Sequence, residues 1–226
     1  GNGILLKHFN QSNEFEEAIF RLIENPEERI AMAKNSFAAS SATTWKNIAI
    51  QYRLLFDQLT NREQDLKFNL PKINLEHIEK MTTENGMLQF SNFSEPDPKS
   101  GYTLDDNARA LIDMVLYNKA YPNEKSIQLA SIYLNFMEGI QRTDGWFDNY
   151  KDFNLQLTEQ NKEVNLEDSN GRAIWSLGTL IAHRESLPLE LVSRAVKCWD
   201  KAITHIDQIR SPRTIAYILK GLYHYY

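Results

Sequence analysis

The sequence contains one cysteine, Cys198, which excludes an internal disulfide and any zinc site built from several cysteines. Nine glycines and seven prolines are few for 226 residues, and this disfavours an all-β fold with many tight turns. The longest nearly apolar run, residues 174–182, is too short to cross a bilayer, so we expect no membrane segment. The low cysteine content favours a cytoplasmic location.

Basic clusters and ligand-binding motifs are also missing from the sequence. Lys and Arg number 25 against 30 Asp and Glu, which gives a net charge of -5 and no basic run for nucleic acid. None of the five histidines stands at the spacing of a metal-binding motif, and there is no glycine-rich nucleotide loop. We therefore expect no metal, no cofactor and no nucleic-acid partner.

Helical periodicity is what the sequence does contain, together with a hydrophobic content of 42% that predicts a folded protein. In the N-terminal part, Asn13 is expected to cap a first helix and Asn25, followed by Pro26, to begin a second. Thr43 or Thr44 is expected to cap a third helix.

The polar stretch 60–72 is typical of a linker, and we predict one domain over residues 1–63 and a second over residues 64–226. In the second domain we expect a short helix over 74–81 and a loop over 91–101. Longer helices are then expected at about 105–119, 124–141, 168–183, 188–209 and 212–226.

These longer helices differ in how they distribute apolar residues. Residues 188–209 form a one-sided amphipathic stripe, whereas 168–183 and 212–226 are apolar or small on more than one face. Alternation of enclosed and one-sided helices is typical of paired-helix solenoids and toroids. We predict an all-α fold in which a helical tail precedes a partial, incomplete α/α toroid of paired helices.

A short repeat marks the beginning of three of the expected helices. Asp105-Asp106-Asn107-Ala108-Arg109 aligns with Asp168-Ser169-Asn170-Gly171-Arg172, and Ser211-Pro212-Arg213 is a fainter third copy. We expect these helices to be neighbours with their N-termini at one end, so that the repeated polar groups surround one mouth of the toroid. The alternative is that each Asp only caps its helix and each Arg only pairs with a nearby carboxylate.

Asp106, Arg109, Asp168 and Arg172 are expected to share one network, because like charges at adjacent helix N-termini need opposite charges between them. If that network is closed, Arg109→Ala should lower the free energy of unfolding by about 3–5 kcal/mol. If it is open, its carboxylates face water and can bind or process a sugar.

Sugar hydrolysis uses two carboxylates that flank the scissile bond, and the candidate catalytic residues are Asp105, Asp106 and Asp168. The segment 142–153 holds several aromatic rings that can stack on sugar faces, although it can equally pack on the helix ends. The predicted substrate-binding residues are Tyr102, Asn107, Arg109, Trp146, Asp148, Asn149, Tyr150, Asn170, Arg172 and Arg213.

The first resemblance to a known family covers roughly residues 1–59. Asn25-Pro26-Glu27-Glu28-Arg29-Ile30 and the later Thr44-Trp45-Lys46-Asn47-Ile48 resemble the closing stretch of GT-B glycosyltransferases of the retaining family four. The donor-binding motif of that family, two glutamates seven residues apart, and its Rossmann-like half are absent from this sequence. The resemblance therefore implies a fragment that is inactive as a transferase by itself, and a nucleotide-sugar that binds only through a missing upstream domain.

The second resemblance covers roughly residues 70–226. Residues 101–111 and 167–178 are similar to an α/α-toroid module appended to some bacterial family-four glycosyltransferases, with the architecture of six-hairpin glycosidases and sugar epimerases. This resemblance implies transfer of a sugar from a nucleotide-sugar donor to a polysaccharide or glycoconjugate, with carbohydrate bound or processed by the toroid. Two alternatives stay open: a glycosidase- or epimerase-like toroid with carboxylate catalysis, and a non-catalytic structural or interaction module.

Overall fold

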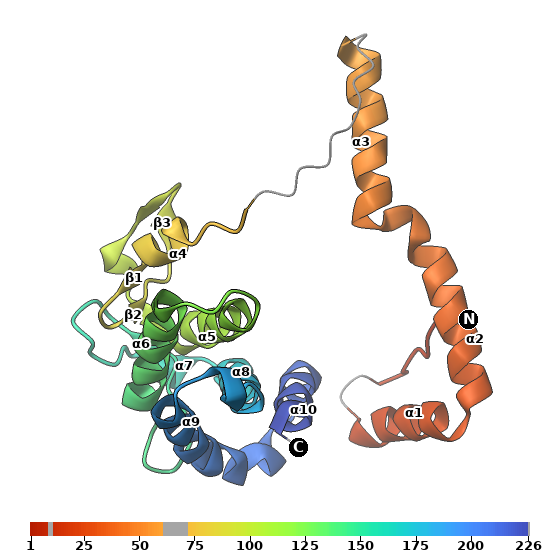
Figure 1. Cartoon of the computed structure of the whole chain (residues 1–226). Helices are drawn as coiled ribbons and strands as arrows, with labels where there is room; N and C mark the ends of the chain where they lie inside the picture. The colour runs from red at the N-terminus through yellow and green to blue at the C-terminus, as the bar shows by residue number, and fades with distance from the viewer. Residues whose placement is uncertain (9–10, 61–71, 226) are drawn as a thin grey trace. The chain divides into compact units, whose positions relative to one another are not determined.

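The computed structural model describes residues 1–8, 11–60 and 72–225 of the chain (Figure 1). Helices dominate, and the strands of the described residues are two-residue antiparallel pairs, so the fold is all-α as predicted. The chain divides into two compact units, Gly1–Pro71 and Lys72–Tyr226. The predicted boundary between residues 63 and 64 lies among residues 61–71, outside the described part.

The described residues of the N-terminal unit form three α-helices, as the periodicity predicts. They are α1 (Ser12–Glu24), α2 (Pro26–Ser40) and α3 (Trp45–Thr60), with a 3₁₀ turn, η1 (Ser41–Thr43), before α3. Thr44 caps α3, since its Oγ1 accepts from the backbone N–H of Asn47 at 3.4 Å.

One cap predicted for this unit is wrong, and a second is confirmed by its position but not by a side-chain bond. Helix α1 begins one residue before Asn13, with Gln11 at the N-cap position. Asn25 does precede α2, but its side chain donates to the carbonyl of Arg21 at 2.8 Å. The Asn25 side chain therefore binds a carbonyl at the C-terminal end of α1 and does not bind a backbone N–H at the beginning of α2.

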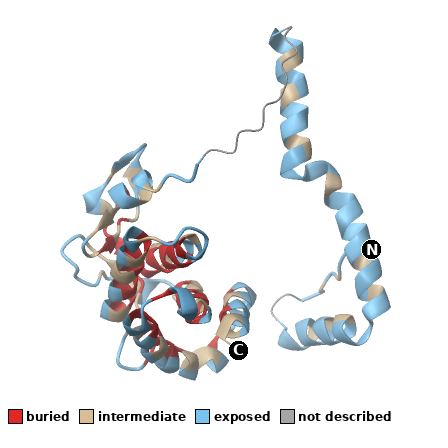
Figure 2. Cartoon of the chain, viewed as in Figure 1, coloured by how far each residue is buried: buried red, intermediate tan, exposed pale blue. Residues whose placement is uncertain are grey.

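None of the described residues of the N-terminal unit is buried (Figure 2). Its large apolar side chains stay accessible, with Trp45 90% exposed and Phe37 75% exposed. The amphipathic stripes of these helices are therefore formed without a hydrophobic core inside the unit. The expectation that residues 1–59 pack on the outside of a toroid stays a prediction.

The C-terminal unit consists of α-helices of four to 17 residues with short strands and turns between them. Its α-helices are α4 (Glu76–Met81), α5 (Leu104–Ala120), α6 (Glu124–Ile140), α7 (Gln160–Glu163), α8 (Glu167–Ala182), α9 (Leu189–Ala202) and α10 (Pro212–Tyr225). The 3₁₀ turns are η2 (Pro98–Ser100), η3 (Arg184–Ser186) and η4 (Ile203–Gln208). The expected helix over 188–209 is thus α9 followed by η4, a common way for a helix to end.

Three short antiparallel strand pairs lie between the helices of this unit; two of them are hairpins, and the third joins segments on either side of α5 and α6. The pairs are β1 (Thr82–Thr83) with β2 (Gly86–Met87), β3 (Ser91–Asn92) with β4 (Glu95–Pro96), and β5 (Tyr102–Thr103) with β6 (Tyr150–Lys151). The expected loop over 91–101 therefore contains β3, β4 and η2. Its prolines exclude an α-helix but not an edge strand.

Helices α5, α8 and α10 lie side by side in one row, which we call the central row (Figure 1). Helix α8 packs between the other two, while α6 packs on α5 and α9 packs on α8. The helix pairs predicted from the sequence are therefore present, and the core lies between the two layers (Figure 2). Closure of such pairs into a toroid stays a prediction.

Glycines allow α8 and α10 to approach closely. A Cβ on Gly171 would lie 2.7 Å from Cγ2 of Thr214, and one on Gly178 would overlap the carbonyl oxygen of Gly221. Backbones at this separation leave no room for a side chain. This close approach fixes the position of α10 against the polar residues at the beginning of α8.

Candidate functional site

The aligned asparagines of the repeat make the same contacts in both copies. Asn107 Oδ1 accepts from the N–H of Met87 at 2.9 Å, and its Nδ2 donates to the carbonyls of Met87 and Thr103. Asn170 Oδ1 accepts from the N–H of Phe147 at 2.9 Å, and its Nδ2 donates to the carbonyls of Phe147 and Leu166. Each asparagine thus binds the connection that leads into its own helix.

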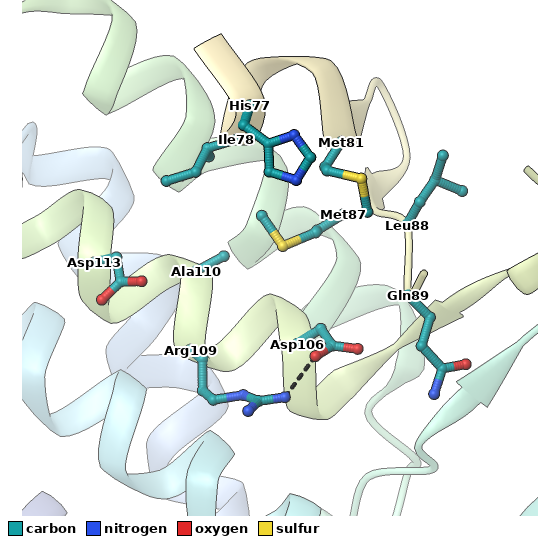
Figure 3. Close-up of a pocket in the computed structure, with 10 residues that line it drawn as sticks. All are labelled: His77, Ile78, Met81, Met87, Leu88, Gln89, Asp106, Arg109, Ala110 and Asp113. Atoms are coloured by element: carbon teal, nitrogen blue, oxygen red, sulfur yellow. Dashed lines mark hydrogen bonds and ion pairs between the residues drawn. The ribbon is translucent and has the colours of Figure 1, made fainter. Parts of the chain in front are cut away.

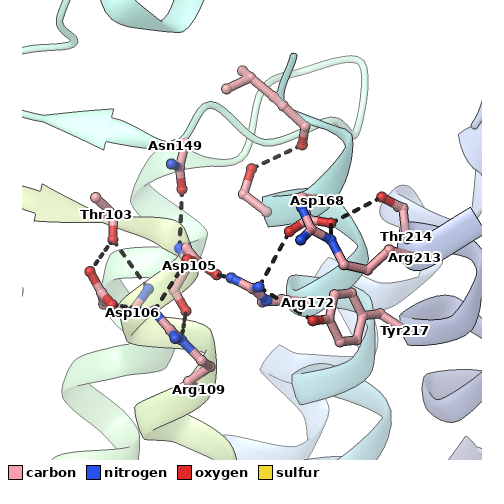
Figure 4. Close-up of polar contacts among 12 residues, drawn as sticks. Thr103, Asp105, Asp106, Arg109, Asn149, Asp168, Arg172, Arg213, Thr214 and Tyr217 are labelled. Atoms are coloured by element: carbon pink, nitrogen blue, oxygen red, sulfur yellow. Dashed lines mark hydrogen bonds and ion pairs between the residues drawn. The ribbon is translucent and has the colours of Figure 1, made fainter. Parts of the chain in front are cut away.

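The aligned aspartates and arginines form a chain of ion pairs across the central row (Figure 4). Asp105 binds Arg109 of its own helix at 3.2 Å and Arg172 of α8. Asp168 in turn binds Arg172 at 3.3 Å and Arg213 of α10 at 2.8 Å. The N-termini of α5, α8 and α10 therefore lie at one end, as predicted from the repeat.

Every carboxylate oxygen of the three candidate catalytic residues has a partner. The two oxygens of Asp105 face Arg172 and Arg109, and those of Asp168 face Arg213 and Arg172. Asp106 accepts from Arg109 at 2.5 Å and from the Thr103 hydroxyl at 2.6 Å. The predicted network is therefore present and closed.

Exposure varies along this Asp–Arg network. The side chain of Arg172 is 17% exposed and that of Asp105 is 25% exposed, whereas Arg109 and Arg213 are 51% and 70% exposed. Burial opposes the charged form of Arg172, but its hydrogen bonds to Asp105 and to the Tyr217 hydroxyl raise its pKa. Arg172 is thus the permanently charged centre of the network.

A polar cavity of about 150 Å³ lies beside the network, between the beginnings of α5 and α8. Five of the residues predicted from sequence line it: Asp105, Asn149, Tyr150, Asp168 and Arg172. Asn149 is buried, and its Oδ1 accepts from the backbone N–H of Asp105 at 3.1 Å. This bond fixes the segment around β6 to the N-terminus of α5.

Other predicted site residues lie elsewhere. Tyr102 is 1% exposed, its ring packs tilted against that of Phe136, and its hydroxyl shares a hydrogen bond of 3.0 Å with the Thr83 hydroxyl, so the structure places it in the core. Asn107 and Asn170 are also buried, and their amide groups are engaged as described above. These three side chains are therefore buried in structural contacts and do not form an exposed binding surface.

Trp146 and Asp148 lie on the loop that follows α6, outside the polar cavity. Trp146 stacks on His205 with ring centroids 5.9 Å apart. Asp148 lies 3.8 Å from Arg142. Of the aromatic residues in segment 142–153, Tyr150 lines the polar cavity, whereas Trp146 packs against His205.

A second cleft, of about 380 Å³, lies between α4 and α5 (Figure 3). Its apolar side contains Met81, Met87 and Leu88, and its polar side contains Asp106, Arg109, Asp113, His77 and Gln89. Partial burial raises the pKa of the Asp113 carboxyl, and the positive charge of Arg109 opposes that shift. Asp106 and Arg109 thus connect the second cleft to the Asp–Arg network.

Two aromatic residues of the central row are not among the site residues predicted from the sequence. Trp175 of α8 and Tyr217 of α10 stack with ring centroids 5.7 Å apart and planes only 4° from parallel. Arg172 lies over the Tyr217 ring at 5.1 Å. The signal available was spacing: Trp175 follows Arg172 by three positions and so lies on the same helix face.

No model of a known protein family matches the chain, and no curated protein matches it either. Across the described residues, no group of three or more His, Cys, Asp or Glu side chains is arranged to hold a metal ion. None of the helices within the described ranges combines the length and the apolar character that crossing a membrane requires.

Proposed function

We propose that this chain is part of a bacterial glycosyltransferase of polysaccharide biosynthesis, and that its C-terminal unit binds glycan without catalysing a reaction. The resemblance of residues 1–59 to the GT-B tail and of residues 70–226 to the appended toroid module supports the first statement. The nucleotide-sugar donor would bind to a domain that is not present in this sequence.

The observation that carries the second statement is the pairing of all three candidate catalytic aspartates with arginines. A glycosidase needs one carboxyl group that gives up a proton and a second that acts as base or nucleophile. Asp105, Asp106 and Asp168 have no oxygen free of an arginine or hydroxyl partner. The closed network thus differs from the open one expected for a sugar site. Each paired carboxylate oxygen still has a second lone pair that can accept a hydrogen bond from a sugar hydroxyl, so the arrangement supports a binding role over a catalytic one.

The polar cavity supplies the groups that hold a sugar. Sugar hydroxyls both donate and accept, so they pair with carboxylate oxygens and with guanidinium N–H groups at the same site. Tyr150, which is half-buried, also lines this cavity. A cavity of about 150 Å³ fits a single small ring system and leaves the rest of a glycan outside.

Carboxylate catalysis is the second candidate. Asp105 and Asp168 line the same cavity from neighbouring helices, which favours it. A sugar that displaced Arg172 would free one oxygen of each. Release of reducing ends from a bound oligosaccharide by the purified chain would establish this candidate and refute the non-catalytic proposal.

The experiment is a glycan array probed with the purified chain, followed by calorimetric titration of the glycans that bind. Tyr150→Ala should weaken binding by about tenfold, equivalent to about 1.4 kcal/mol, because a residue that lines the cavity loses its side chain. Tyr223→Ala is the matched control, since Tyr223 lies on α10 with 83% exposure. Absence of any bound glycan, or equal effects of the two variants, would contradict the proposal.

A further inference from the structure

The second cleft differs from the polar cavity in how its polar side chains are engaged. In the polar cavity, the carboxylates of Asp105 and Asp168 are both paired with arginines. In the second cleft, the side chains of His77, Gln89 and Asp113 have no hydrogen bond or ion pair with any residue that the structure describes. These three groups are therefore available to a ligand without the loss of an existing contact.

The three available groups come from different elements around the cleft (Figure 3). His77 lies on α4, Gln89 lies between β2 and β3, and Asp113 lies on α5. A carboxylate accepts hydrogen bonds, whereas an amide and a neutral imidazole both donate and accept them. A ligand with several hydroxyl groups, which also donate and accept, can satisfy all three side chains at once.

The apolar side of the cleft offers a surface to the carbon skeleton of such a ligand. Ile78 and Met87 are half-buried and form its accessible part, while Met81 and Leu88, which also line the cleft, are buried. A methionine side chain adapts to an irregular surface because it is unbranched and flexible. An apolar lining with a few polar groups is the usual composition of a small-molecule site. At about 380 Å³ against about 150 Å³, the second cleft also has more room than the polar cavity.

The two cavities meet at the beginning of α5. Asp105 lines the polar cavity, and the next residue, Asp106, lines the second cleft. Arg109 Nη2 binds both carboxylates, at 3.2 Å from Asp105 and 2.5 Å from Asp106. The Arg109 side chain is 51% exposed, so the boundary between the cavities is accessible from solvent. A ligand made of several linked rings can therefore extend from one cavity to the other.

We propose that the polar cavity and the second cleft are neighbouring subsites for consecutive sugar units of one glycan chain, with Arg109 between the two units. This proposal rests on the glycan-binding function proposed above and adds a requirement for length. The ligand is an oligosaccharide or a polysaccharide, because a monosaccharide fills one subsite and leaves the contacts of the other unmade. His77, Gln89 and Asp113 are the polar groups that bind the unit in the second cleft.

Homologous oligosaccharides test the requirement for length. The purified chain is titrated by calorimetry with glucose, mannose, galactose and N-acetylglucosamine series, each as mono-, di-, tri- and tetrasaccharide. For a series that binds, the Kd should fall by about tenfold or more from the monosaccharide to the trisaccharide. The reason is that a linked second unit adds its contacts at a high effective concentration.

Variants of the second cleft locate the added contacts. Asp113→Asn removes the charge with little change of shape, and Gln89→Ala removes the amide. Each should raise the Kd of the trisaccharide by about tenfold. Neither should lower the Tm, since the side chains have no described partner to lose. Asp200→Asn is the matched control, because Asp200 is an exposed aspartate of the outer helix α9 and should not affect binding.

Methionine methyl signals provide a readout that does not depend on affinity. In a chain labelled with carbon-13 at the methionine methyl groups, the signal of Met87 should shift when the trisaccharide is added. The signal of Met137, which is buried in the core, should not shift. A substitution of Met87 by Leu assigns its signal.

The outcomes separate the two proposals. A trisaccharide that binds no more tightly than the monosaccharide and leaves the Met87 signal unmoved would overturn the second subsite, and the glycan-binding function would stand. Equal effects of Asp113→Asn and Asp200→Asn would also overturn the second subsite alone. Absence of binding by every series would overturn both proposals.

Discussion

Arg172 is the residue on which the Asp–Arg network depends, because within this network it is the side chain that bridges α5 and α8. Its removal would leave Asp105 and Asp168 facing each other across the cavity without the cation between them. Arg172→Ala should therefore lower the free energy of unfolding by about 2–4 kcal/mol, measured by urea denaturation.

Arg109→Ala is the matched comparison for Arg172→Ala. Arg109 pairs with Asp105 and Asp106 but is 51% exposed, so its loss should cost about 1 kcal/mol or less. The sequence alone predicted that Arg109→Ala would lower the free energy of unfolding by about 3–5 kcal/mol if the network is closed. Because Arg109 is exposed, we now expect the larger loss for the more buried Arg172. Equal losses of unfolding free energy in the two variants would show that burial of the arginine does not determine its contribution to stability.

Cys198 should be chemically inert in the native state. It is 4% exposed, and burial raises the pKa of its thiol to about 11. Only the thiolate attacks disulfide reagents. With a chromogenic disulfide reagent at neutral pH, the native chain should therefore show almost no increase in absorbance. After denaturation it should react with one equivalent, as the single cysteine requires. Rapid reaction of the native chain would contradict the buried position.

At the scale of elements, the contact between α8 and α10 requires glycine. Gly178→Ala adds a methyl group where the carbonyl of Gly221 lies, so the helices must separate. We expect a loss of about 2 kcal/mol or more in spite of the better helix propensity of alanine. The measurement is the midpoint of thermal unfolding followed by circular dichroism.

Gly139→Ala in α6 is the control for this substitution. A Cβ on Gly139 would meet only Lys151 Nζ, at an ordinary 3.7 Å. The same change should therefore leave stability unchanged or raise it by up to about 1 kcal/mol. A loss of similar size in both variants would assign the effect to the helices themselves and not to their packing.

The long helices could be predicted from the sequence because apolar periodicity is local, and the repeat located the helix ends that carry the network. The roles of Asn107 and Asn170 could not be predicted. An amide in the first turn of an enclosed helix has the same appearance whether it faces a ligand or a buried backbone group, and only the burial distinguishes them.

Aromatic residues show the same difficulty at this scale. The rings of segment 142–153 stood out because they are clustered in a loop, yet Trp146 packs against His205. Trp175 and Tyr217 stand at helical spacing, which is typical of core residues, and so their half-exposed stacking was not predicted. The partners of a ring on another helix are set by tertiary packing, and the sequence does not encode them locally.

At the scale of the whole molecule, all buried residues of the described chain belong to the C-terminal unit. A chain restricted to residues 72–226 should therefore fold and unfold cooperatively, with a Tm within about 4 °C of that of the full chain. Differential scanning calorimetry of the two chains makes the comparison. A truncated chain without a cooperative transition would show that the N-terminal helices contribute to the core.

The asparagine contacts have a consequence for the order in which the molecule folds. Asn107 reaches back 20 residues to Met87, and Asn170 reaches back 23 residues to Phe147, so each contact closes a short loop. The bond from Arg172 to Asp105 spans 67 residues and needs both helices in place. Because short loops close at lower entropic cost, each repeat can reach its own structure before the repeats join. A chain of this kind can fold progressively as it leaves the ribosome, one repeat after another, with the ion pairs formed last.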